Sequence, residues 1–180
     1  MRKNYGSKPF LYPQPVMIIG TYNEDGTPNA MNAAWGGMCG PNHIIIDLSP
    51  HKTTDNIRAT GAFTVCVAEA PHMEAADYLG VVSGYEVPDK ISKAGLHTTK
   101  SEFVNAPIID EFAIALECKL VDFTPHGVVG EIMNVSIDDR VIKEDGSIDI
   151  DKIDAIVYDP FNIAYLKLGG KVGDAFVNTL

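Results

Sequence analysis

The chain has 180 residues, 46% of them hydrophobic and 21% charged, which is typical of a globular protein with one domain, residues 1–180. Its formal net charge of −10 disfavours nucleic acid and anionic membrane as partners, because their phosphates would be repelled. No stretch approaches the twenty apolar residues of a membrane helix, and the basic N-terminus lacks the apolar run of a signal peptide, so we expect a cytoplasmic protein.

The predicted elements are mainly strands. The β-rich segment 16–22 and the turn sequence Asn-Glu-Asp-Gly at 23–26 predict a hairpin at the start of the chain. Further apolar or alternating segments predict strands at 44–48, 62–68, 112–121 and 128–137. Gly130 inside the last of these indicates a bulge or a sharp barrel corner.

Helices are predicted to be few and short. One is expected at 53–60, with Thr53 or Thr54 as N-cap, and a second at 71–79, with Gly80 as its stop. A third is expected at 88–94, ending before a glycine. About six strands with short helices inserted favour a closed antiparallel barrel, because closure removes exposed strand edges.

A small, amide-rich segment is the first candidate for ligand binding. It follows the first predicted hairpin turn and comprises Asn29, Ala30, Met31, Asn32, Ala33, Ala34 and Trp35. Side chains with little bulk allow a backbone to approach a flat polar ring closely, as the ring of a flavin requires. The alternative is an alanine-rich strand with two turn-forming asparagines.

A second candidate lies where a strand is expected to give way to a helix. Ser49, Lys52 and Thr53 place hydroxyls and an ammonium beside the N–H groups of a helix start, which suits a phosphate. His51 could assist as a donor. The alternative is an ordinary capped helix with a surface lysine.

Other chemistries have little support in the sequence. The three cysteines, Cys39, Cys66 and Cys118, are widely spaced, and no histidines pair at ligand spacing, so we expect no metal site. Cys66 and Cys118 lie in apolar runs and are expected to be reduced core thiols, whereas Cys39 lies in a glycine-rich loop. Glycine-rich nucleotide fingerprints are absent, which argues against a Rossmann dehydrogenase.

Several short motifs, in order, resemble one known family. They include residues 26–35, 52–57, Ser83-Gly84 with Asp89-Lys90, Gly130-Glu131 and the segment 165–170. Together they resemble the flavin reductase-like family of FMN-binding split barrels, and within it the flavoredoxin branch.

The resemblance implies a mainly β, six-stranded antiparallel Greek-key split barrel that forms a homodimer with FMN near the interface. It implies that residues 29–34 line the ring and ribityl chain, that Trp35 belongs to the same cofactor site, and that Ser49, Lys52 and Thr53 hold the phosphate. It places Ser83, Asp89, Lys90 and Tyr165 near the flavin, from one subunit or the other. His126 is implied in the catalytic neighbourhood, although it stands about one residue closer to Gly130 than its counterpart in relatives.

Two functions follow from the resemblance. The first is an oxidoreductase in which hydride passes from NAD(P)H to bound flavin and electrons pass on to free flavin or to a redox protein. The alternative is a flavoredoxin-type electron-transfer protein that does not itself turn over nicotinamide. Neither requires a side chain that acts as acid or base, because the cofactor carries the chemistry.

Overall fold

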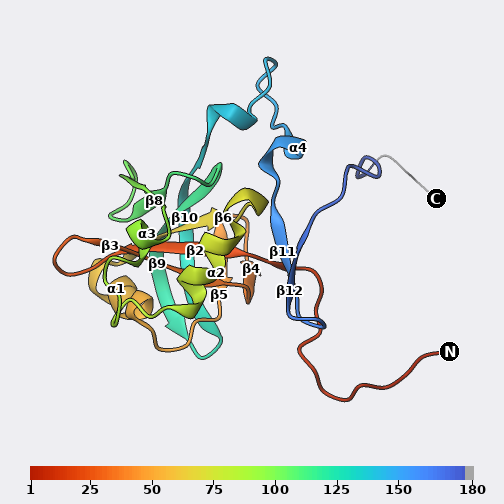
Figure 1. Ribbon diagram of the computed structural model, residues 1–180, viewed down its shortest axis with the longest axis horizontal. Coiled ribbons are helices and arrows are strands. Elements are labelled where there is room, and N and C mark those ends of the chain that lie inside the picture. Colours follow the sequence, from red (N-terminus) through yellow and green to blue (C-terminus); the bar gives the residue numbers. More distant parts are fainter. Residues whose placement is uncertain (177–180) are drawn as a thin grey trace.

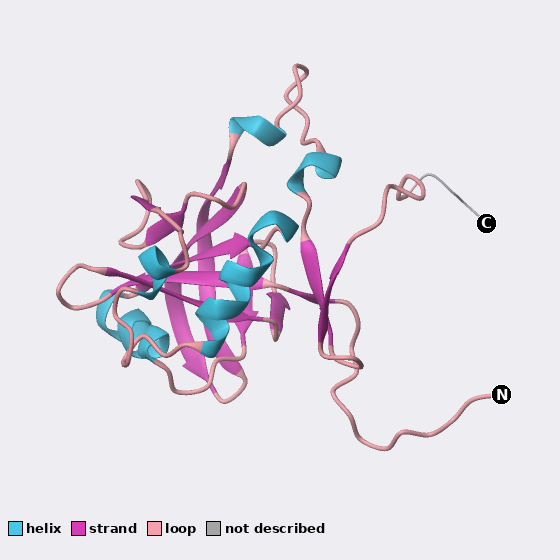
Figure 2. Ribbon diagram, viewed as in Figure 1, coloured by secondary structure: helices cyan, strands magenta, loops and turns pink. Residues whose placement is uncertain are grey.

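A curled antiparallel sheet of seven strands is the largest sheet of the protein, and the computed structural model describes residues 1–176 (Figures 1 and 2). The strand order in this sheet is β3-β2-β6-β9-β10-β5-β4. These strands are β2 (Met17–Tyr22), β3 (Pro28–Ala33), β4 (Gly36–Met38), β5 (His43–Ile46), β6 (Ala62–Val67), β9 (Ile114–Thr124) and β10 (Gly127–Ile137).

The sheet curls so that its two edges, which are neighbours in the chain, approach each other. Strands β3 and β4 lie at opposite edges, yet only Ala34 and Trp35 separate them. The chain can cross from one edge to the other in two residues only if the edges approach each other. The predicted mainly β, antiparallel split barrel with few short helices is confirmed, and the short β4 is an addition to the six strands expected.

Two smaller sheets complete the strands. The sequence pattern did not predict their members, because each has only two to four residues. One sheet has the order β1-β11-β12 and the other pairs β7 with β8. Their bounds are β1 (Gln14–Pro15), β7 (Thr98–Lys100), β8 (Pro107–Ile109), β11 (Ile156–Asp159) and β12 (Ala164–Lys167). Figure 1 shows the β11–β12 hairpin in blue at one side of the main sheet.

The helices are α1 (Lys52–Thr60), α2 (Met73–Val81), α3 (Lys90–Lys93) and α4 (Ile150–Ile153). Single 3₁₀ turns lie at Ala70–His72 and Asp139–Val141. None of the helices in residues 1–176 has the length and apolar character needed to cross a bilayer.

Helix α1 begins one residue before the predicted start, so the prediction of Thr53 or Thr54 as N-cap is wrong. His51 is the N-cap, with an extended backbone. The hydroxyl of Thr54 turns back instead, accepting from the His51 N–H at 2.9 Å and donating to the His51 carbonyl at 2.7 Å. The predicted stop of α2 at Gly80 is also wrong, since the helix runs on to Val81.

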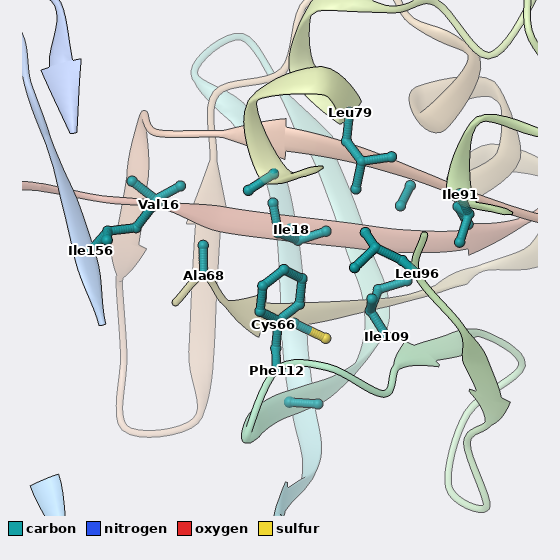
Figure 3. Packing of buried hydrophobic residues seen from close by; sticks show 13 residues of the cluster. Val16, Ile18, Cys66, Ala68, Leu79, Ile91, Leu96, Ile109, Phe112 and Ile156 are labelled. Carbon is teal, nitrogen blue, oxygen red and sulfur yellow. The ribbon is translucent and has the colours of Figure 1, made fainter. Parts of the chain in front are cut away.

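Strand β2 is buried on both faces and divides the core. Ile18 belongs to a cluster with Cys66, Leu79 and Ile109, beneath helix α2 (Figure 3). Met17 and Ile19 point to the opposite side, into a cluster around Phe63. A strand covered on both faces reads as a continuous apolar run, which is the pattern of this segment.

The structure confirms two further predictions, the buried Cys66 and Cys118 thiols and the irregularity at Gly130. Cys66 and Cys118 are free and buried, and burial raises the pKa of each thiol to about 12. The register between β9 and β10 shifts between Val129 and Gly130, which confirms the predicted irregularity.

Candidate functional site

A cleft of about 280 Å³ opens between the end of β3, the loop before α1 and the β11–β12 hairpin. It brings together half of the cofactor-binding residues predicted from the sequence: Met31, Asn32, Ala33, Ala34, Trp35, Ser49 and Tyr165. Asp47, Leu48, His51 and Tyr158 complete its lining. Segments that are distant in the sequence therefore meet around one polar and aromatic hollow.

The first two residues of the amide-rich segment lie outside this lining. Ala30 is completely buried in the core. Asn29 is 2% exposed, and its Nδ2 donates to Thr53 Oγ1 at 2.9 Å. Asn29 and Thr53 therefore tether β3 to the start of α1.

The start of α1 borders the cleft through Ser49 and His51. The first-turn N–H groups of a helix have no carbonyl of their own helix to bind, and they carry partial positive charge. The neighbouring Lys52 Nζ lies 5.7 Å from the centre of the Tyr85 ring. This corner offers N–H groups, a hydroxyl, an imidazole and an ammonium within one short segment.

The loop carrying Ser83 packs against the same corner. A Cβ at Gly84 would lie 2.3 Å from Asn29 Oδ1 and 3.4 Å from Lys52 Cγ, so only glycine allows this approach. Ser83 itself is exposed, and its Oγ accepts from the Tyr85 N–H at 3.2 Å. The structure thus places the residue after Ser83 against Lys52, and Ser83 itself outside the cleft lining.

Asp89 and Lys90 have other partners within this chain. Lys90 is 3% exposed, and its Nζ donates to the Leu79 and Val82 carbonyls at 3.0 and 2.8 Å. It therefore caps the C-terminal end of α2. Asp89 forms a surface ion pair with Lys93 at 2.9 Å. Neither residue lines the cleft.

The pH dependence of folding provides a test of this position of Lys90. Burial lowers the pKa of Lys90 from 10.5 to about 8. Between these values the unfolded chain holds a proton that the folded chain has lost, so this group makes the free energy of unfolding rise with pH. Below pH 8 both states are charged and the burial penalty is fully present.

We expect the stability of the wild type relative to Lys90→Met to increase from pH 8 to pH 10.5 in urea titrations. The exposed Lys119→Met serves as the control and should show no such trend. If the difference in free energy of unfolding between the wild type and Lys90→Met does not change with pH, this would contradict the buried position of the ammonium.

His126 lies in the exposed turn between β9 and β10, where its N–H donates to Thr124 Oγ1 at 3.1 Å. It does not line the cleft. The next residue, Gly127, has φ of +136°, and a Cβ there would lie 2.4 Å from the Ile46 carbonyl oxygen. The turn therefore packs against the end of β5, one residue before Asp47 in the cleft wall.

Tyr165 joins the hairpin to the rest of the site. Its hydroxyl donates to Asp77 Oδ1 at 2.9 Å and accepts from Asn32 Nδ2 at 3.2 Å. Burial, with a further contribution from Asp77, raises the pKa of Tyr165 to about 12, so the phenol remains protonated at neutral pH.

Asp47, Leu48 and Tyr158 line the cleft but were not predicted from the sequence. Tyr158 had no local signal, because β11 reaches the cleft by pairing with β1, more than 140 residues earlier. Asp47 and Leu48 could have been included as neighbours of Ser49.

The comparisons with known proteins agree with this architecture. Residues 10–158 match the family described as flavin reductase-like domain. The flavoredoxin of Desulfovibrio vulgaris (Miyazaki F) is 36% identical, with 98% of both chains covered and a TM-score of 0.93. A flavoredoxin from Methanosarcina acetivorans is 26% identical, with 98% of this chain and 96% of that chain covered and a TM-score of 0.86.

A curated relative gives a shorter match. An uncharacterized protein of Aeropyrum pernix is 31% identical over 120 residues, which are 65% of this chain and 45% of that protein. The chain thus spans less than half the length of that relative. The family match covers most of the chain, and the chain belongs to the flavin reductase-like domain family.

Proposed function

We propose that this protein holds FMN in the cleft beside β3 and passes electrons to a redox partner protein. The observation that carries the proposal is the meeting of residues 31–35 with Ser49 and His51 at the start of α1. The likeness to two flavoredoxins over nearly the whole chain supports the electron-transfer reading. The net charge of −10 suits docking to a basic partner surface.

The residues of the cleft fit this cofactor in chemical character. Ala33 and Ala34 leave room for a flat ring, and Trp35 and Tyr158 add aromatic surface. Ser49, His51 and the helix start suit a phosphate dianion. When bound, FMN supplies the redox chemistry, while the protein supplies orientation and electrostatics. A cleft of about 280 Å³ is at the small end for a ligand site, so it leaves part of such a ligand to solvent or to a second subunit.

The second candidate is an NAD(P)H-dependent reductase, which the family match favours. In that case the cofactor would receive hydride from NADH or NADPH and pass electrons to free flavin or to a protein. The two candidates share the FMN site and differ in whether nicotinamide reduces it.

One experiment separates the candidates. The purified protein is loaded with FMN, and its visible spectrum is recorded without oxygen before and after addition of NADH or NADPH. A flavin band that neither nucleotide bleaches, but dithionite does, supports the electron-transfer protein. Rapid bleaching by either nucleotide supports the reductase. A protein that does not take up FMN contradicts both.

The Lys52 side chain provides a test of the phosphate corner. We expect Lys52→Ala to weaken FMN binding by about 1–3 kcal/mol, because a charge-assisted contact is lost. Binding is measured by quenching of FMN fluorescence. Lys52 borders the cleft without lining it, and Lys119→Ala, at an exposed lysine on β9, is the matched control. Equal affinity in both variants would place the phosphate elsewhere. Thr53→Ala is less clean, since Thr53 Oγ1 also accepts from Asn29.

We further propose that two copies pair with the cleft near their interface. Large apolar side chains are exposed on and beside the hairpin next to the cleft: Trp35 is 38%, Phe161 50% and Ile163 80% exposed. Exposed apolar surface of this kind marks an interaction site. Sedimentation should show a dimer at micromolar concentration for the wild type and a monomer for Ile163→Glu, and a monomeric wild type with FMN bound would contradict the proposal.

A further inference from the structure

The side-chain amide of Asn32 is held by two contacts at the edge of the cleft. Its Nδ2 donates to the Ala76 carbonyl at 3.0 Å and to the Tyr165 hydroxyl at 3.2 Å. The first partner comes from α2 and the second from β12. Both amide hydrogens are therefore used within the protein.

These contacts fix the orientation of the amide. A flipped amide would place Oδ1 against the Ala76 carbonyl, and two acceptors would then repel each other. Within residues 1–176, Oδ1 accepts no hydrogen bond. Among the side-chain nitrogen and oxygen atoms there that solvent does not reach, only Ser136 Oγ lacks a hydrogen-bond partner. Oδ1 of Asn32 is therefore reachable by solvent, and Asn32 lines the cleft.

Asp77 governs the second contact without lining the cleft. A phenol has one proton, and the Tyr165 hydroxyl directs it to Asp77 Oδ1 at 2.9 Å. The Tyr165 oxygen is thus left as an acceptor for Asn32. Without Asp77, this proton would be free to point toward Asn32 or into the cleft. The Tyr165 hydroxyl would then act as a donor that competes with the Asn32 amide.

We propose that Asp77 is a positioning residue which, through Tyr165, keeps Asn32 Oδ1 as a fixed acceptor that selects the N–H of the bound ring. This inference rests on the proposed function, because it concerns the same cleft. The oxidised isoalloxazine ring has one N–H, at N3, and its other polar edge atoms are acceptors. A fixed acceptor therefore distinguishes FMN from FMN methylated at N3.

The test compares the dissociation constants of FMN and N3-methyl-FMN, measured by fluorescence titration on the full chain. We expect the wild type to favour FMN by about tenfold, the effect of one hydrogen bond, and Asn32→Leu to lose this preference. Asp77→Ala should lower the preference at least threefold. Tyr165→Phe removes the misdirected proton, so Asp77→Ala should have no further effect in that background.

Asp145→Ala is the matched control. Asp145 also makes two local hydrogen bonds, to Ser147 N and Oγ, but it lies in an exposed turn outside the cleft lining. Its preference should equal that of the wild type. Because the readout is a ratio for two ligands, a general loss of stability does not imitate the effect.

Other outcomes overturn the inference. A wild type that binds both flavins equally, or an unchanged preference in Asp77→Ala, would show that Asn32 is not a selecting acceptor held by Asp77. The same loss in the wild-type and Tyr165→Phe backgrounds would show that Asp77 does not act through Tyr165. Failure of the wild type to bind FMN at all would instead refute the proposed function.

Discussion

Replacement of Arg140 by methionine is expected to lower the free energy of unfolding by about 3 kcal/mol. The Glu69 carboxylate that Arg140 pairs with is only 1% exposed, and Arg140 Nη2 lies 2.8 and 2.9 Å from its two oxygens. The arginine side chain itself is 43% exposed. Losing the arginine therefore leaves an unpaired charge in the interior, which costs more than losing the ion pair would cost at the surface.

The reciprocal change should be milder. In the wild type the Ala113 N–H donates to Glu69 Oε1. Glu69→Gln removes the buried charge but keeps an oxygen that can accept this hydrogen bond. In an Arg140→Met background, Glu69→Gln should therefore restore part of the lost stability. Asp138→Ala is the control, because it removes a 3.5 Å exposed contact to the same arginine and the hydrogen bond that Asp138 Oδ1 accepts from the Arg140 N–H. It should cost about 1 kcal/mol, less than Arg140→Met. Urea denaturation measures all four, and equal costs for Arg140→Met and Asp138→Ala would contradict the argument.

Local patterns predicted the parts of the fold whose causes are local. The hairpin turn at 23–26 depends on Gly26, which has φ of +81°, and the flanking strands pair in register from Tyr22 with Pro28 to Met17 with Ala33. The start of the helix after residue 50 was found within one residue, since hydroxyls and the acidic Asp55 follow one another at its first turn. Its cap was misassigned because threonine is a favoured cap residue, whereas the structure has His51 as the N-cap and Thr54 hydrogen-bonded back to it.

Long-range contacts determined what the sequence could not predict. The end of α2 is set by Lys90, whose ammonium reaches back to the Leu79 and Val82 carbonyls, so the glycine at position 80 does not stop the helix. The same lysine was assigned to the cofactor by resemblance, and no local pattern reveals that it is buried. Tyr165 was placed near the site by resemblance alone, and its hydrogen bond to Asp77 had no local signal, because 88 residues separate the two.

Replacement of Phe63 by alanine is expected to destabilise the protein by about 3–5 kcal/mol, since Phe63 is completely buried and its loss leaves a cavity. The ring fits against Gly130 on β10, where a Cβ would lie 2.4 Å from Phe63 Cζ and 2.8 Å from Cε1. Gly130→Ala should therefore cost about 1–3 kcal/mol through overpacking. These two costs have opposite causes, a void and a clash at the same position.

The double variant provides the decisive measurement. An alanine methyl at position 130 would occupy part of the space that the missing ring vacates, so the Phe63→Ala/Gly130→Ala protein should be more stable than the sum of the single costs predicts. Phe112→Ala, a buried phenylalanine in the other core cluster, is the control and should combine additively with Gly130→Ala. Gly130 lies on β10, and the turn that precedes this strand packs against the end of β5. A change in the fit between Phe63 and Gly130 is therefore expected to affect the cleft wall at Asp47 as well. Additive costs for Phe63→Ala and Gly130→Ala would mean that the contact between ring and glycine does not shape the barrel.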